Sequence, residues 1–226
     1  MYKYLVEMFG DNRILDLCLP LLSFIDYIKR KASKKEMIPL QVINCMDVEN
    51  NLPLPTLVEP SDLLDIIHIR KLMIHLLGNA VGHDWYPVYS TFKHGFSLST
   101  MYRNMLEFEG SPVLLVVQDS FGKLFGAMVP SHLRVSDRFY GTGESFLFSF
   151  DENNEMQIFH WTGANDYVIK GSIDSIAFGS GDGYFGLWLD QSLYHGSSST
   201  CTTYNNEHLG TKQDFIIHGV EAWGFV

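Results

Sequence analysis

Between Ser61 and Gly110, apolar residues recur at three- and four-residue steps, the spacing of one face of an α-helix. One apolar stripe predicts a helix that starts at Ser61 as its N-cap and ends at Gly78. A second stripe predicts a helix capped by Ser97 or Ser99 and ended by Gly110. We therefore expect two helices in this part of the chain.

After Pro112 the period changes from three or four to two, and turn residues separate short apolar segments. Alternation of this kind is typical of antiparallel strands with tight connections. The fold class predicted is α+β, an antiparallel two-sheet β-sandwich flanked by helices. The expected strands cover 113–118, 123–129, 144–150, 155–161, 166–170, 172–178, 184–190, 214–218 and 221–226.

Residues 1–58 differ from the rest of the chain. Their first part has a partly amphipathic, helix-like pattern that Pro20 interrupts, and a proline-rich stretch follows. We expect residues 1–58 to form a leader or arm and residues 59–226 to form one domain. A chain of 226 residues suffices for one substantial core.

Charge argues against general nucleic-acid binding, because 16 basic against 26 acidic residues leave a net charge of −10. The exception is the run "KRKASKK" at 29–35, which has five basic and no acidic residues. This run is typical of a solvated linker, and a nuclear signal or a contact with an acidic membrane surface are the alternatives.

The cysteine pattern indicates a reducing compartment. The three cysteines are far apart, and the chain contains no Cys-x-x-Cys pair. The early apolar run 18–25 is too short to span a bilayer. We expect no transmembrane segment and a monomer located in the cytoplasm, with the nucleus or the periphery of organelle membranes as further locations.

The stretch "GDGYFG" at 181–186 has the glycine spacing of a dinucleotide-binding loop. Phosphate binding also needs a helix after the glycines, whose N-terminal amides face the phosphates. The following residues alternate with period two, so the stretch predicts a tight turn between strands and no bound cofactor.

Other candidate chemistry is incomplete. The nine histidines show no metal-binding spacing, and no Gly-x-Ser-x-Gly motif of a serine hydrolase occurs. Glu144 follows two glycines at the start of a strand, where backbone amides could hold its carboxylate. Cys201 lies in a polar loop and could be an oxidisable thiol or a buried, inert one. No metal site is predicted.

Six longer motifs, in this order along the chain, resemble the TLDc family, in the branch of the oxidation-resistance proteins and their nuclear receptor coactivator relatives. The resemblance extends from about Glu59 to the C-terminus. The motifs are "YSTFKHGFSLSTMYR" (89–103), "VSDRFYGTGESFLFSF" (135–150), "FHWTGANDYVIKG" (159–171), "IAFGSGDGYFGLWLD" (176–190), "YHGSSSTCTTYNN" (194–206) and "DFIIHGVEAWGFV" (214–226).

This resemblance implies a noncatalytic protein-interaction module that protects against oxidative stress by binding peripheral subunits of the vacuolar proton-pumping ATPase. The alternatives are a redox scavenger or weak enzyme that uses Cys201 or Glu144, and a transcriptional coregulator with 29–35 as its nuclear signal. The candidate partner-binding positions carried over from the family motifs are Lys93, His94, Gly95, Gly141, Gly143, Glu144, Gly179, Gly181, Gly183, Gly196 and Asn205.

Overall fold

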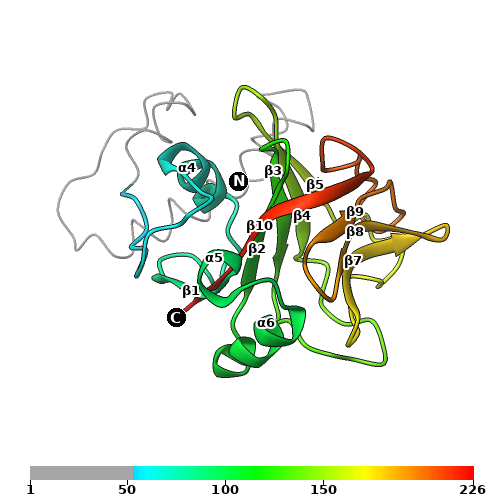
Figure 1. Cartoon of the computed structure of the whole chain (residues 1–226), viewed down its shortest axis with the longest axis horizontal. Coiled ribbons are helices and arrows are strands. Elements are labelled where there is room, and N and C mark those ends of the chain that lie inside the picture. Colours follow the sequence, from blue (N-terminus) through cyan, green and yellow to red (C-terminus); the bar gives the residue numbers. More distant parts are fainter. Residues whose placement is uncertain (1–52) are drawn as a thin grey trace, which may run out of the picture.

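The computed structural model describes residues 53–226, so the predictions for most of the 1–58 leader lie outside the described residues. Figure 1 shows two packed groups of strands, with the long strand β10 running through both of them. All strand pairs in this part of the chain are antiparallel, apart from an isolated parallel bridge between Leu57 and Trp85. The chain thus has the predicted α+β class and a sandwich-like arrangement.

Strand β10 joins the two layers. Its residues from Gly219 onward pair with β2 and β1, whereas its first residues, from Asp214 to Ile216, pair with β9. The strands of the first layer are β1 (Trp85–Ser90), β2 (Val113–Asp119), β3 (Leu124–Val129), β4 (Phe146–Phe150), β5 (Met156–His160) and β10 (Asp214–Phe225). Those of the second are β6 (Ile169–Gly171), β7 (Ser175–Gly181), β8 (Tyr184–Asp190) and β9 (His195–Ser197).

The first layer is buried on both faces, which explains the uninterrupted apolar run 113–117 in β2. Leu115 and Val117 belong to the core between the two layers. Leu114 and Val116 alternate with them and belong to a second core, against which the helix α4 (Ile66–Ile74) packs. In Figure 1, α4 lies beside the first layer.

The first predicted helix differs from the structure at both ends, and α4 already ends at Ile74 instead of Gly78. The predicted N-cap Ser61 was wrong, because α4 begins at Ile66 with Asp65 as its N-cap. The helix α6 (Leu98–Met105) confirms the second prediction, with Ser97 as its cap and a short 3-10 turn, Leu106–Phe108, after it. A one-turn helix, α5 (Thr91–His94), was not predicted. Within residues 53–226, every helix is too short or too polar to cross a membrane.

The strand predictions hold for β2, β3, β4, β5 and β8. The segments 214–218 and 221–226 form one strand, because β10 continues through a register irregularity between Ile217 and Gly219. The predicted strands 166–170 and 172–178 are shifted, because β6 is Ile169–Gly171 and β7 is Ser175–Gly181. Strands β1 and β9 were missed; β1 pairs with the distant β10, and β9 lies between β8 and β10.

The predicted turn in "GDGYFG" is confirmed. Asp182 and Gly183 connect β7 to β8 and have φ angles of 54° and 84°. Two central residues with positive φ are typical of the two-residue turn that matches the twist of an antiparallel hairpin.

Candidate functional site

Four loops carry most of the predicted partner-binding positions, and they meet at the edge of the second layer. We call them the four-loop surface; they comprise residues 141–145, 161–167, 179–183 and 201–206. The surface contains Gly141, Gly143, Glu144, Gly179, Gly181, Gly183, Cys201 and Asn205.

Asn165 is the centre of a hydrogen-bond network in the four-loop surface. Its side-chain amide donates to the Ser180 carbonyl at 3.2 Å and to the Thr202 hydroxyl at 2.9 Å. Its side-chain oxygen accepts from the Thr203 hydroxyl at 2.7 Å. The indole N–H of Trp161 donates to the Asn165 carbonyl at 2.7 Å. One amide side chain therefore links three of the four loops.

Two glycines let the loops approach closely. A Cβ at Gly143 would lie 2.2 Å from the Trp161 ring, and a Cβ at Gly181 would lie 1.8 Å from the Thr202 hydroxyl. Contacts this short cannot exist in a folded protein. These glycines are therefore needed for loop packing, which is a different role from phosphate binding.

Glu144 is exposed on the four-loop surface. Within residues 53–226 its carboxylate makes no hydrogen bond or ion pair, so the amide cradle considered above is not formed there. Asp166 and Asp182 are also exposed, and the four loops contain no lysine or arginine. The surface is therefore acidic and suits a basic partner surface.

Cys201 is 2% exposed, and its thiol donates to the Asn206 side-chain oxygen at 3.2 Å. Burial raises the pKa of this thiol, although hydrogen bonds from the backbone of Tyr204 and Thr203 oppose the shift. A buried thiol with a raised pKa is a poor source of thiolate, which weakens the redox alternative at this position.

The remaining predicted positions lie outside the four-loop surface. Lys93 forms an ion pair with Glu59, whose hydrogen bond raises the lysine pKa. His94 stacks on Tyr89, and the carbonyl of Gly95 accepts a hydrogen bond from the Tyr89 hydroxyl. Gly196 belongs to β9, where a Cβ would lie 2.4 Å from the Phe215 ring. The close contacts at Tyr89 and at Phe215 indicate packing roles for His94, Gly95 and Gly196.

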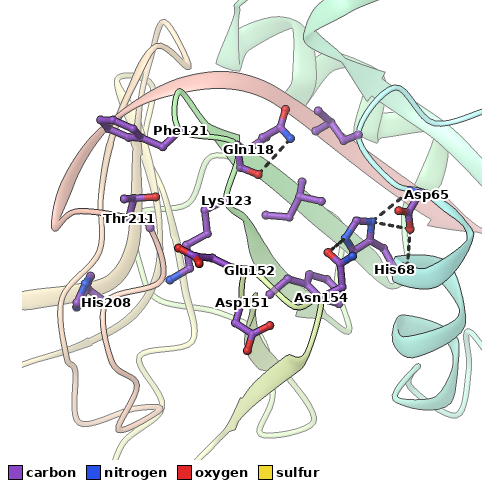
Figure 2. Close-up of a pocket in the computed structure, with 15 residues that line it drawn as sticks. Asp65, His68, Gln118, Phe121, Lys123, Asp151, Glu152, Asn154, His208 and Thr211 are labelled. Atoms are coloured by element: carbon purple, nitrogen blue, oxygen red, sulfur yellow. Dashed lines mark hydrogen bonds and ion pairs between the residues drawn. The ribbon is translucent and has the colours of Figure 1, made fainter.

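A second feature, which the sequence did not suggest, is a cavity of about 830 Å³. We call it the cleft. Figure 2 shows it between the start of α4, the β2–β3 turn, the β4–β5 turn and the loop before β10. Leu63, Leu124 and Phe150 contribute apolar surface, and each is less than 9% exposed.

Aspartates hold two of the turns in place. The fully buried carboxylate of Asp119 accepts from the amides of Phe121 at 2.9 Å and Lys123 at 3.0 Å. Its other oxygen accepts from the Thr211 amide at 2.8 Å and so fastens the loop before β10. The carboxylate of Asp151 accepts in the same way within the β4–β5 turn.

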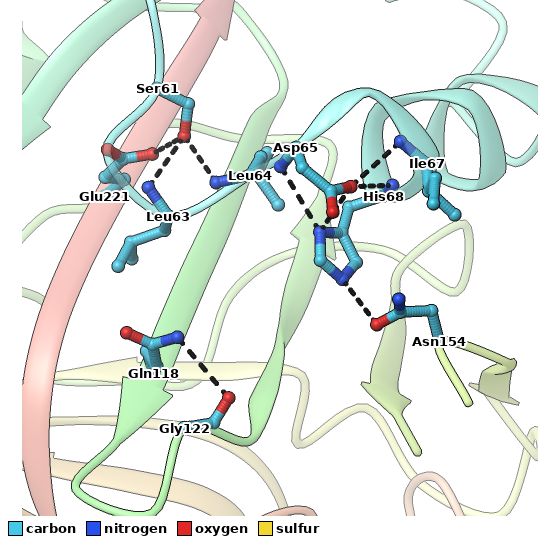
Figure 3. Close-up of polar contacts among 10 residues, drawn as sticks. All are labelled: Ser61, Leu63, Leu64, Asp65, Ile67, His68, Gln118, Gly122, Asn154 and Glu221. Atoms are coloured by element: carbon cyan, nitrogen blue, oxygen red, sulfur yellow. Dashed lines mark hydrogen bonds and ion pairs between the residues drawn. The ribbon is translucent and has the colours of Figure 1, made fainter. Parts of the chain in front are cut away.

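His68 connects α4 to the β4–β5 turn. The backbone N–H of Asp65 lies 3.2 Å from Nδ1, and Nε2 lies 3.1 Å from the Asn154 side-chain oxygen. Nδ1 also lies 2.9 Å from a side-chain oxygen of Asp65, so the ring contacts both the backbone and the side chain of the N-cap residue. The ring also lies edge-on to Phe150, with 4.7 Å between the ring centroids. Figure 3 shows the contacts of His68 with Asp65 and Asn154, by which it positions α4 against the β4–β5 turn.

The lining of the cleft bears on its chemistry. Asp65, Asp151 and Glu152 supply three carboxylates against the single ammonium of Lys123. No serine or cysteine is among its described lining residues, so nucleophilic catalysis through either of them has no support there. Within residues 53–226, no group of three potential metal ligands is present either.

Sequence reasoning missed the cleft because its lining comes from four separated segments. One local signal existed. Asp65 and His68 have the three-residue spacing of a helix capping box, and both of its hydrogen bonds form. Ser61, taken for the cap, instead donates to Glu221 at 2.5 Å and accepts from the Leu64 amide (Figure 3).

Comparisons with known proteins agree on one family. Residues 57–226 match the TLDc domain. The chain is 50% identical over 171 residues to Oxidation resistance protein 1 of Xenopus tropicalis, covering 76% of this chain and 19% of that protein. It is 49% identical over 179 residues to the human protein of that name, covering 79% and 20%. Nuclear receptor coactivator 7 of Gallus gallus is 46% identical over 172 residues, covering 76% and 19%.

The matched region thus spans about a fifth of the length of these curated relatives. The match itself covers three quarters of this chain, and it includes both the four-loop surface and the cleft. The chain belongs to the TLDc family.

Proposed function

We propose that this protein is a noncatalytic interaction module that protects against oxidative stress by binding and regulating the vacuolar proton-pumping ATPase. The observation that carries the proposal is the four-loop surface, where residues far apart in the sequence meet in an acidic face held by the Asn165 network. The family membership and the printed name of the oxidation resistance relatives support the connection with oxidative stress.

A rigid acidic face acts on a large partner by binding one of its conformations better than another, because a ligand shifts an equilibrium only through differential affinity. The loops are preorganised by tight packing, which lowers the entropy lost on association. The partner surface expected here is basic and belongs to the peripheral subunits of the pump.

The test is capture of detergent-solubilised pump by the immobilised full chain, together with the ATPase activity of the assembled pump after addition of the chain. Replacing an exposed acid of the four-loop surface, Glu144→Lys, should reduce both effects. The matched control is Glu107→Lys, an exposed acid in the 3-10 turn after α6. Absence of capture with unchanged ATPase activity would refute the proposal.

A second candidate function is transcriptional coregulation. It is supported by the similarity of the chain to a protein named Nuclear receptor coactivator 7. It would use the basic run 29–35 as a nuclear signal. Nuclear enrichment of the full chain that disappears when these basic residues are replaced by glutamine would support it.

A further inference from the structure

We infer that the cleft binds an arginine- or lysine-bearing segment of a partner protein, independently of the four-loop surface. Its volume of about 830 Å³ falls within the roughly 300–1,000 Å³ typical of ligand-binding pockets. A single side chain would not fill a cavity of this size. The occupant is therefore a short extended segment.

The charges of the cleft identify the class of side chain. Three carboxylates face one ammonium group among the lining residues, so the cleft attracts cations. Asp65 and Asp151 use one carboxylate oxygen each in hydrogen bonds to backbone amides, and that oxygen of Asp65 also lies 2.9 Å from Nδ1 of His68. Their second carboxylate oxygens make no hydrogen bond within residues 53–226. Glu152 is exposed and makes no hydrogen bond or ion pair within residues 53–226, so its carboxylate is available to a ligand.

The apolar parts of the cleft suit the rest of a basic side chain. Leu63 and Phe150 line the cleft but are only 7% and 2% exposed, so the apolar surface available to the methylene groups of arginine or lysine is mainly that of Phe121. Phe121 lies in the β2–β3 turn and is 64% exposed. The Lys212 ammonium lies 5.1 Å from the centroid of its ring, so a basic ligand at this ring would have to take the place of Lys212.

The walls of the cleft are rigid enough to be selective. Asp119 fixes the β2–β3 turn and the loop before β10, and His68 fixes α4 to the β4–β5 turn. A site whose walls are fixed in this way does not need to order itself on binding. The charge pattern and the exposed aromatic ring together distinguish a basic segment from an acidic or purely apolar one.

The experiment uses the full chain and a fluorescein-labelled eight-residue peptide of leucine, glycine and two arginines. A matched peptide carries glutamine in place of each arginine. Fluorescence anisotropy should show binding of the arginine peptide that weakens with added salt, and little binding of the glutamine peptide. Equal binding of the two peptides, or no binding at millimolar protein, would overturn the inference.

Three variants locate the site. Glu152→Gln and Phe121→Ala should each weaken binding about two- to fivefold, the effect of losing one exposed ion pair or cation–π contact. Lys123→Gln should strengthen binding by about twofold, because it removes a like charge. Glu144→Gln is the matched control on the four-loop surface and should have no effect. Sensitivity to Glu144→Gln with indifference to Glu152→Gln would place the peptide elsewhere and overturn the inference.

One further variant tests the alternative occupant within the chain itself. The five basic residues between 29 and 35 are replaced by glutamine. Equal peptide affinity of this variant and the wild type supports a partner segment as occupant. Binding that occurs only in this variant means that the chain's own basic run fills the cleft, which overturns the assignment to a partner.

Because neither peptide nor variants involve the vacuolar pump, failure of this inference and failure of the proposed function are separate results. Loss of pump capture with intact peptide binding would affect only the four-loop surface.

Discussion

Gly143→Ala should loosen the four-loop surface at Trp161, which packs against the edge of the core between the two layers. The added methyl group would be placed 2.2 Å from Cε3 of Trp161, so the indole ring has to move. Moving the ring breaks the 2.7 Å hydrogen bond from its N–H to the carbonyl of Asn165. Asn165 in turn holds Ser180, Thr202 and Thr203, and the disturbance therefore reaches three loops.

The magnitude follows from two terms. Overpacking of a fitted contact costs about 1–3 kcal/mol, and loss of a hydrogen bond to the backbone costs about 1 kcal/mol. Trp161 is only partly buried, so its ring can move toward solvent and relieve part of the overpacking. The total cost is therefore near the lower end of the range that these two terms give. We expect a loss of about 2 kcal/mol in the free energy of unfolding, which corresponds to a decrease of about 4–8 °C in Tm for a domain of this size.

The assay is urea unfolding of the full chain followed by circular dichroism, with tryptophan emission as a second probe for the ring. The matched control is Gly78→Ala, because a Cβ at Gly78 meets nothing within 4 Å and its φ is not in the left-handed region. Gly78→Ala should change stability by less than about 0.5 kcal/mol. Equal unfolding midpoints of Gly143→Ala and wild type would refute the packing argument.

Three further predictions concern buried groups. In a variant with the other two cysteines replaced by serine, Cys201 should react slowly with a thiol reagent in the folded chain and rapidly in urea. The reason is that burial shields the thiol and raises its pKa. Immediate reaction of the folded chain would contradict this prediction. Burial, and next the nearby charge of His160, lower the pKa of His75 to about 4. The pKa of this histidine in the unfolded chain is higher, about 6.5. The stability that the neutral ring contributes is therefore fully present above about pH 6.5 and is lost as the pH falls toward 4. Between pH 7 and pH 4, the free energy of unfolding measured in urea should fall by up to about 3 kcal/mol less in His75→Phe than in the wild type. An equal fall in both proteins would refute this prediction. Asp119→Ala leaves three backbone N–H groups without their acceptor and should cost about 3 kcal/mol, measured by the same unfolding assay; a loss under about 1 kcal/mol would contradict it.

Local patterns were enough to predict much of the architecture. The period-two segments from β2 to β5, and the turn at Asp182 and Gly183, depend on backbone preferences of adjacent residues. Most positions carried over from the family motifs lie in loops that the structure brings together. The exceptions are Gly196 and the positions 93–95 in and after α5.

Other features depend on contacts between distant residues. The capping box of Asp65 and His68 was a local signal for the start of α4, but the hydrogen bond from Ser61 to Glu221, 160 positions away, is visible only in the structure. Strand β1 pairs with the distant β10, and β9 lies between β8 and β10.

The sequence by itself determined the strands β2 to β5 and the turn at Asp182 and Gly183, because their geometry depends on neighbouring residues. Only the tertiary structure decided that Cys201 is buried, that Glu144 is exposed, and that turns from separate hairpins enclose a cleft. Burial and electrostatic environment are sums over residues adjacent in space, and a linear pattern of apolar and polar positions does not contain those distances.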